Sequence, residues 1–319
     1  MGVNMQQNQL MKITAIYTVL FAVCVFAVII YYSANNIAGI EEVPPADIVQ
    51  TTETAIQEST DNKAESIRDE NSIIFEQNGQ EMNYFCIPLH ESVKAESVMI
   101  ENHYMDKELW VSIKQTVTVD DYENFYRTQG VYGNRKAVSE GRFESKDGTF
   151  WLKFKLNDIY EYHSIFEDNK LYVEFVSPKE VYDRIVVIDP AYGGDVTGAV
   201  SGELEGKDVT LSIARALKEK LDKTDIKVYY TRMDDNNPSD ANRIDLTNAV
   251  KADLMIRIEV NENEDTKIYG TEAVYNGKFF IPGFGSPELA DLLERNVATQ
   301  ISGKANGLVD SADEDVVIN

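Results

Sequence analysis

A stretch of 20 residues without a charge, residues 13–32, constrains this chain more than any other feature. As a helix it is long enough to cross about 30 Å of hydrocarbon. Lys12 precedes it and acidic residues follow it, which by the positive-inside bias predicts a cytoplasmic N-terminus and an exported remainder. The alternative is a cleaved signal peptide, which needs a shorter apolar core and a small-residue cleavage site. We predict residues 1–12 as cytoplasmic, residues 13–32 as a single-pass anchor in the cell membrane, and the bulk as extracytoplasmic.

An excess of acidic residues runs through the rest of the chain. Residues 33–70 carry nine acidic residues, two basic ones and no aromatic residue, so we predict a disordered acidic linker there. The whole chain has 54 Asp and Glu against 30 Lys and Arg, a net charge of −24. This balance excludes nucleic acid as a partner, because its binders need a basic face. The two cysteines cannot form a disulfide framework.

Between residues 71 and 180 apolar and polar residues alternate. Leu109, Val111 and Ile113 form one such series, and a second runs over residues 149–156. Period two with turn residues between the runs is typical of half-buried antiparallel strands. We predict a small all-β, sandwich-like domain over residues 71–180. The tyrosine-rich region 122–132 is interpreted as a loop, either a ligand face or ordinary strand and loop aromatics.

From residue 184 the pattern changes to strands that alternate with helices. The continuous apolar run 185–188 is typical of a central parallel strand, and apolar residues recur every four positions from Val209 to Leu221. We expect strands at 185–188, 227–231, 254–258 and 271–275, helices at 208–222 and 240–250, and a further helix with Ser286 as its N-cap. This order predicts an α/β domain with a mainly parallel sheet over residues 184–319.

In open α/β sheets, ligands bind beyond the carboxyl ends of the strands. Here those ends carry the segments 189–194, 231–234 and 259–261. The sequence therefore predicts that three distant segments meet at one edge of the sheet.

The motifs in these segments resemble those of the zinc-dependent N-acetylmuramoyl-L-alanine amidases, cell-wall hydrolases with a catalytic α/β domain. The opening motif I-D-P-G-H-G-G stands here as Ile188-Asp-Pro-Ala-Tyr-Gly-Gly194. The family's later motifs follow in order, as Gly206-Lys-Asp208, Thr231-Arg232 with Asp234, Arg243 with Thr247-Asn248, Ala252-Asp253, Arg257-Ile-Glu-Val-Asn261 and Gly270-Thr-Glu272. The resemblance implies an amidase-like fold from about residue 184 to residue 319.

The same resemblance implies a zinc ion held by two histidines and a glutamate, with a second glutamate moving protons. Carried over, the ligand positions fall on Tyr192, Gly206 (with Glu205 adjacent) and Glu259, and no histidine follows residue 163. The family's catalytic glutamate belongs to a last strand that this sequence does not reach, so we interpret the domain as truncated at its C-terminus. We therefore predict no catalytic residue, no metal ligand and no cofactor.

The function expected from this pattern is a non-catalytic pseudo-amidase that binds or regulates at the cell wall, with peptidoglycan or another cell-wall protein as its partner. The candidate cleft residues are Asp189, Tyr192, Glu205, Arg232, Glu259 and Asn261. Oxygen ligands from Tyr192, Glu205, Glu259 and Glu262 would suit Ca²⁺ or Mg²⁺, the alternative being a cleft of solvated carboxylates. Two alternatives for the whole chain stay open: an active peptidoglycan amidase with an atypical site, or a truncated product.

Overall fold

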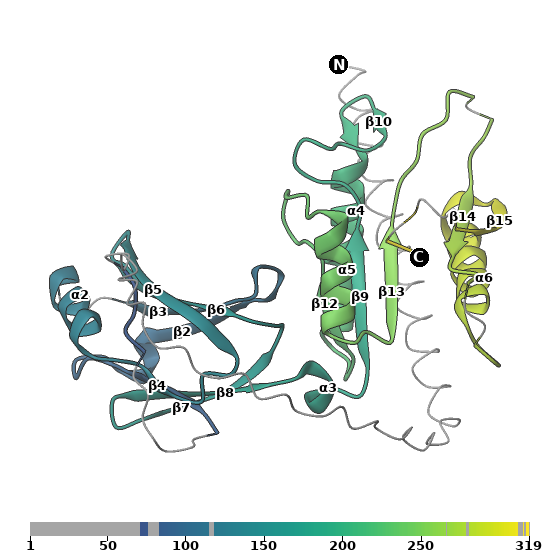
Figure 1. Ribbon diagram of the computed structural model, residues 1–319. Coiled ribbons are helices and arrows are strands. Elements are labelled where there is room, and N and C mark those ends of the chain that lie inside the picture. The colour runs from purple at the N-terminus through teal and green to yellow at the C-terminus, as the bar shows by residue number, and fades with distance from the viewer. Residues whose placement is uncertain are drawn as a thin grey trace, which may run out of the picture.

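The computed structural model describes residues 71–75, 83–114, 118–265, 267–278, 281–311, 315 and 317–318 (Figure 1). The predicted cytoplasmic segment 1–12, the membrane span 13–32 and the acidic linker 33–70 lie outside these residues. Within the described part of the chain, no helix is long and apolar enough to cross a membrane.

Two antiparallel sheets of four strands each make up the first part of the structure. One has the strand order β2 (Val98–His103), β3 (Glu108–Lys114), β6 (Thr149–Leu156) and β5 (Val138–Lys146). The other has the order β4 (Tyr132–Gly133), β1 (Phe85–Pro88), β8 (Lys170–Val176) and β7 (Glu161–Glu167). The alternation in the sequence determines which side chains face inward: Leu109, Val111 and Ile113 are all buried.

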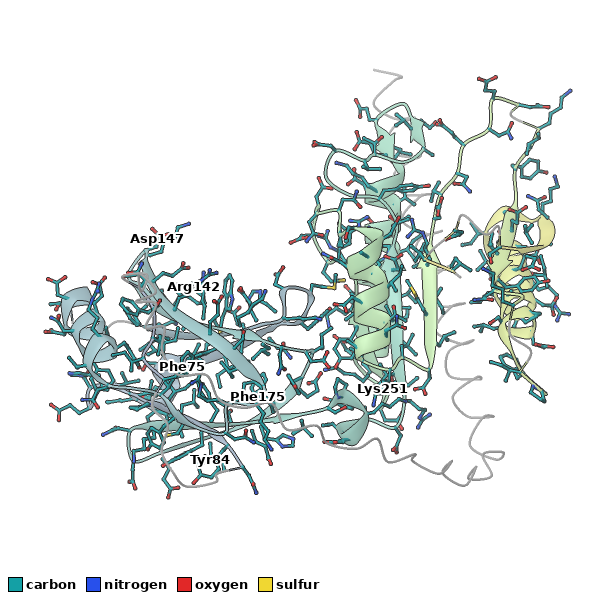
Figure 2. The ribbon with its side chains drawn as sticks, viewed as in Figure 1. Phe75, Tyr84, Arg142, Asp147, Phe175 and Lys251 are labelled. Atoms are coloured by element: carbon teal, nitrogen blue, oxygen red, sulfur yellow. The ribbon has the colours of Figure 1, made fainter. Side chains whose placement is uncertain are left out.

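Residues of both sheets belong to one hydrophobic cluster. Phe85 and Val173 of the second sheet join Val111 and Leu152 of the first. Phe75 and Phe175, labelled in Figure 2, pack against the same cluster. Burial of these apolar side chains from two sheets at once is the main stabilising contribution in this part of the molecule.

The interpretation of residues 122–132 as a loop is wrong over residues 122–128. Residues Val119–Thr128 form helix α2, which begins at the N-cap Thr118, whose side chain accepts a hydrogen bond from the Asp121 N–H. Tyr122 and Tyr126 are fully buried and stack on Phe150. A helical spacing of four residues places both rings on the core side, so they contribute to packing and do not form a ligand face.

A three-layer α/β unit follows the short helix α3 (Pro178–Val181). Its sheet is parallel, as expected, and has the order β12 (Lys227–Tyr230), β9 (Ile185–Pro190) and β13 (Leu254–Ile258). Val186 and Ile188 of β9 face helix α4 (Gly206–Leu221), whereas Ile185 and Val187 face helix α5 (Asp240–Ala249). Figure 1 shows both green helices beside these strands. A short hairpin, β10 (Val200–Ser201) and β11 (Leu204–Glu205), precedes α4.

The fourth predicted strand lies in a second sheet. Strand β14 (Thr271–Tyr275) has the predicted bounds and pairs in parallel with β15 (Ala305–Asp310), a strand that the sequence analysis did not predict. Helix α6 (Ser286–Val297) and a π-helical turn (Ala298–Ser302) connect the two strands. The N-cap of α6 is Gly285, not Ser286, because the Glu288 carboxylate reaches back to the Gly285 N–H.

The antiparallel sheets and the α/β unit contact each other along the edge of strand β12. The Tyr104 hydroxyl donates to the Tyr230 carbonyl (2.8 Å) and accepts from the Tyr230 N–H (3.1 Å). Glu161 accepts from the Tyr229 hydroxyl (2.5 Å) and pairs with Lys227 (2.7 Å). These contacts supply hydrogen bonds to the backbone of an edge strand, which otherwise has unpaired groups.

Candidate functional site

The carboxyl ends of β9, β12 and β13 meet at Asp189, as the sequence predicts. Asp189 is fully buried. Its Oδ1 accepts from the Thr231 hydroxyl (2.5 Å) and from the Arg243 guanidinium, and its Oδ2 accepts from Arg257 Nη1 (2.9 Å). A buried carboxylate is tolerated only when it is paired and hydrogen-bonded, and here one residue after β12, one within β13 and one from α5 satisfy it.

Tyr192 follows β9 and reaches across to the end of β13. Its hydroxyl lies 2.9 Å from Glu259 Oε1, 3.2 Å from the Val260 carbonyl and 3.3 Å from Asn261 Oδ1. Burial, followed by the hydrogen bond to Glu259, raises the pKa of this hydroxyl above its usual range. Tyr192 is therefore a neutral hydrogen-bond donor in this cleft at physiological pH.

The backbone conformation at Tyr192 is unusual for a residue with a side chain, because its φ angle is +67°. The next residue, Gly193, has a φ of +136°, and a Cβ there would lie 1.9 Å from the Asn236 carbonyl oxygen. Gly198 lies against the tyrosine ring, since a Cβ at that position would meet a ring carbon at 2.4 Å. The two glycines are thus needed to bring the Tyr192 ring over the end of β13.

Arg257, the fourth residue of β13, links the buried carboxylate to the cleft. Besides its bond to Asp189, its Nε lies 3.2 Å from Glu259 Oε2. The Arg257 side chain is 20% exposed and that of Glu259 is 40% exposed, so this pair connects the interior to the surface. Burial lowers the pKa of Arg257, but the charges of Asp189 and Glu259 outweigh it and leave the pKa above its ordinary value.

Arg232, predicted as a cleft residue, supports the loops below the cleft. It is buried, and its guanidinium donates to the carbonyls of Pro190, Ala191 and Lys207 at 2.9 Å each. Backbone carbonyls in tight loops lack partners from regular structure, and one planar guanidinium satisfies several of them. Arg232 thus fixes the turn that carries Tyr192.

Glu205 belongs to a different group of charges, at the start of α4. Its carboxylate lies 3.4 Å from Lys207 Nζ, which also pairs with Asp235 (3.0 Å) and donates to the Gly194 carbonyl (2.8 Å). The six predicted cleft residues therefore divide into three sets: Tyr192 with Glu259 and Asn261 around its hydroxyl, Asp189 and Arg232 in the buried layer, and Glu205 beside Lys207.

Sequence reasoning missed Arg257 and Arg243 as site residues. Arg257 interrupts the apolar strand Leu254–Ile258, and a charge at such a position is a signal, because it needs a partner in the fold. Arg243 was noted only as part of a motif on α5. Its partner Asp189 is 54 residues away in the sequence, so their pairing follows only from the fold.

Comparisons with known proteins identify the second part of the chain. Residues 186–316 match the family model described as N-acetylmuramoyl-L-alanine amidase. The chain is 28% identical over 164 residues to the germination-specific N-acetylmuramoyl-L-alanine amidase of Bacillus subtilis, covering 46% of this chain and 68% of that protein. It is 26% identical over 132 residues to the amidase LytC of the same organism, covering 41% of this chain and 26% of LytC.

Among solved structures, an N-acetylmuramoyl-L-alanine amidase of Clostridium difficile 630 is 32% identical. That match covers 42% of this chain and 72% of that structure, with a TM-score of 0.38.

Of the three positions onto which the resemblance carries the family's zinc ligands, only Glu259 offers a donor that zinc usually takes in proteins. Gly206 has no side chain. The Tyr192 hydroxyl and the Glu259 carboxylate are bonded to each other, and the second Glu259 oxygen faces Arg257. Within the described residues, no three His, Cys, Asp or Glu side chains gather closely enough to hold a metal ion.

The ordered motifs and the family match agree on the same segment. The family predicted from the sequence is thereby confirmed for the α/β part, whereas the match leaves the preceding residues unassigned. Over residues 186–316 this chain is similar to the N-acetylmuramoyl-L-alanine amidase family.

Proposed function

We propose that this chain is a membrane-anchored, extracytoplasmic protein that acts at peptidoglycan as a non-catalytic binding or regulatory member of the amidase family. Residues 13–32 would anchor it, residues 33–70 would hold the remainder away from the membrane, and residues 71–180 would form a β-sandwich-like domain. Peptidoglycan or another cell-wall protein would be its partner, because its relatives are named for an amide bond of that polymer.

The observation that carries this proposal is the set of contacts at the ligand positions. Amide hydrolysis of this type needs a metal that polarises the carbonyl and acidifies a water molecule. In this chain the oxygens of Tyr192 and Glu259 are directed to one another and to Arg257. A carboxylate that joins a hydroxyl and a guanidinium places polar groups of three kinds side by side, and such groups are suited to recognition of polar ligands.

The Arg232 and Asp189 contacts support the same reading, because they stabilise loops without taking part in chemistry. Both side chains are nearly inaccessible to solvent, at 3% and 0% exposure. A fold can retain such residues when catalysis is lost, since function resides in the site and not in the fold.

The test is incubation of the full chain, in detergent micelles, with purified peptidoglycan and added Zn²⁺. We expect the protein to sediment with the wall material and to release no stem peptide from muramic acid. An active amidase serves as the positive control for cleavage. Metal-dependent release of stem peptide would refute the proposal in favour of an active enzyme. The absence of both release and sedimentation would exclude peptidoglycan as the partner and leave a cell-wall protein.

A cleft variant makes the binding test specific. Glu259→Gln removes the charge that orients Tyr192 and Arg257, so we expect less protein in the wall pellet. Glu264→Gln removes an equal charge from an exposed position in the same loop and is the matched control. Equal sedimentation of the two variants would place wall binding outside the cleft.

A further inference from the structure

Arg257 lies between two carboxylates of different environments. Its Nη1 is 2.9 Å from the fully buried Asp189, and its Nε is 3.2 Å from the half-exposed Glu259. The second cation on Asp189, Arg243, is 1% exposed and also donates to the Pro238 carbonyl and to Asn237. Arg257 is therefore the cation that connects the buried carboxylate to the cleft.

Both oxygens of Glu259 are engaged within the chain. Oε1 accepts from the Tyr192 hydroxyl at 2.9 Å, while Oε2 faces the Arg257 guanidinium. A charge-assisted contact of this kind holds a carboxylate in one orientation. Glu259 thus stabilises the conformation of Tyr192, with its positive φ, through a hydrogen bond, and Arg257 in turn holds the Glu259 carboxylate in place.

We propose that Arg257 is a built-in cation that takes the place of a metal ion in this cleft. This inference rests on the proposed non-catalytic function and assigns the residue that keeps the site ordered without a metal. The guanidinium neutralises Glu259, the single charged group among Tyr192, Gly206 and Glu259 at physiological pH, and it repels a divalent cation that would approach the same carboxylate. The cleft is then organised from within the chain at every metal concentration.

The proposal predicts how thermal stability responds to metal and to substitution. Zn²⁺ and chelators should leave the unfolding temperature of the full chain unchanged in detergent. Arg257→Met removes the cation from two carboxylates, one of them buried, so the unfolding temperature should fall by roughly 5–10 °C. Arg257→Lys retains the charge but lacks the planar set of donors, so its unfolding temperature should fall by less. This variant keeps the test informative where the Met variant fails to fold.

The matched control is Arg184→Met, which removes an arginine from an exposed pair with Asp225 in the same unit. Its effect should be roughly 2 °C or less, because exposed ion pairs contribute little. A double variant, Arg257→Met with Glu259→Gln, separates the proposed role from general packing. If the two side chains act together, the unfolding temperature of the double variant should fall by less than the sum of the decreases in the two single variants.

Three results would overturn the proposal. One is stoichiometric Zn²⁺ binding by the unaltered chain in calorimetry, with a rise in unfolding temperature that a chelator reverses. Another is a decrease in unfolding temperature in Arg257→Met that is no larger than in Arg184→Met. The last is a decrease in the double variant that equals the sum of the decreases in the two single variants. Cleavage of peptidoglycan with an unchanged thermal response would refute the proposed function and leave this assignment of Arg257 intact.

Discussion

The contact between Tyr104 and strand β12 predicts that the two parts of the structure unfold together. Strand β12 lies at the edge of its sheet, and the backbone N–H and carbonyl of Tyr230 point away from β9 toward the Tyr104 hydroxyl. Tyr104→Phe deletes both hydrogen bonds and leaves two backbone groups of a residue that is 4% exposed without this partner. At about 1 kcal/mol for each bond, the free energy of unfolding should fall by about 2 kcal/mol.

The two tryptophans make this prediction measurable. Trp110 and Trp151 both lie in the antiparallel sheets, so their fluorescence reports on that part during urea unfolding. The circular dichroism of helices α4 and α5 reports on the α/β unit. In the unaltered chain the two transitions should coincide, as expected of one cooperative unit. In Tyr104→Phe the transition at the α/β unit should come at lower urea concentration.

Tyr160→Phe is the matched control, because its hydroxyl bonds to Asn157 within the same loop. It should change the free energy of unfolding by about 0.5 kcal/mol or less, the lower end for an exposed hydrogen bond. Equal losses in Tyr104→Phe and Tyr160→Phe, or well-separated transitions in the unaltered chain, would refute the reasoning.

Two further changes test the loops and the interface. Gly193→Ala should destabilise the chain by about 2 kcal/mol or more, because the new Cβ clashes with the Asn236 carbonyl. The control Gly202→Ala has a positive φ but open space around it, so it should destabilise the chain by only roughly 1–2 kcal/mol. Thermal unfolding of both variants measures the difference. Burial, and then the hydrogen bond to Glu161, hold the pKa of Tyr229 above its ordinary value near 10. Below pH 10 this contribution to stability is fully present, and above it the free energy of unfolding should fall by up to about 1.4 kcal/mol per pH unit, a slope that Tyr229→Phe should reduce in urea titrations at pH 9 to 11.

Local patterns in the sequence were sufficient for much of the fold. The alternation over residues 149–156 predicts strand β6 with its observed bounds, and the four-residue spacing predicts α4 to within two residues. Both patterns depend only on which side of an element is buried. The alternation of strands and helices predicts parallel strands, and parallel strands place their carboxyl ends at one edge of the sheet.

What the sequence could not show depends on contacts between distant residues. The bounds of β14 were predicted, but its partner is β15, 34 positions further on at Thr271 and Ala305, and strand propensity carries no information on pairing. Tyr122 and Tyr126 of helix α2 stack on Phe150, and this contact between distant positions cannot be read from the segment alone. The role of Arg257 follows from Asp189, 68 residues away.

The two sides of strand β9 have different neighbours, and this has an evolutionary consequence. Ile185 and Val187 pack in a cluster that includes Ile159 and Tyr104 of the other part of the chain, whereas Val186 and Ile188 pack only within the α/β unit. Neighbouring positions of one strand are thus subject to separate selection. In a lineage that lost the antiparallel sheets, positions 185 and 187 would keep their contacts with helix α5 but lose those with Ile159 and Tyr104, whereas the neighbours of positions 186 and 188 would be unchanged.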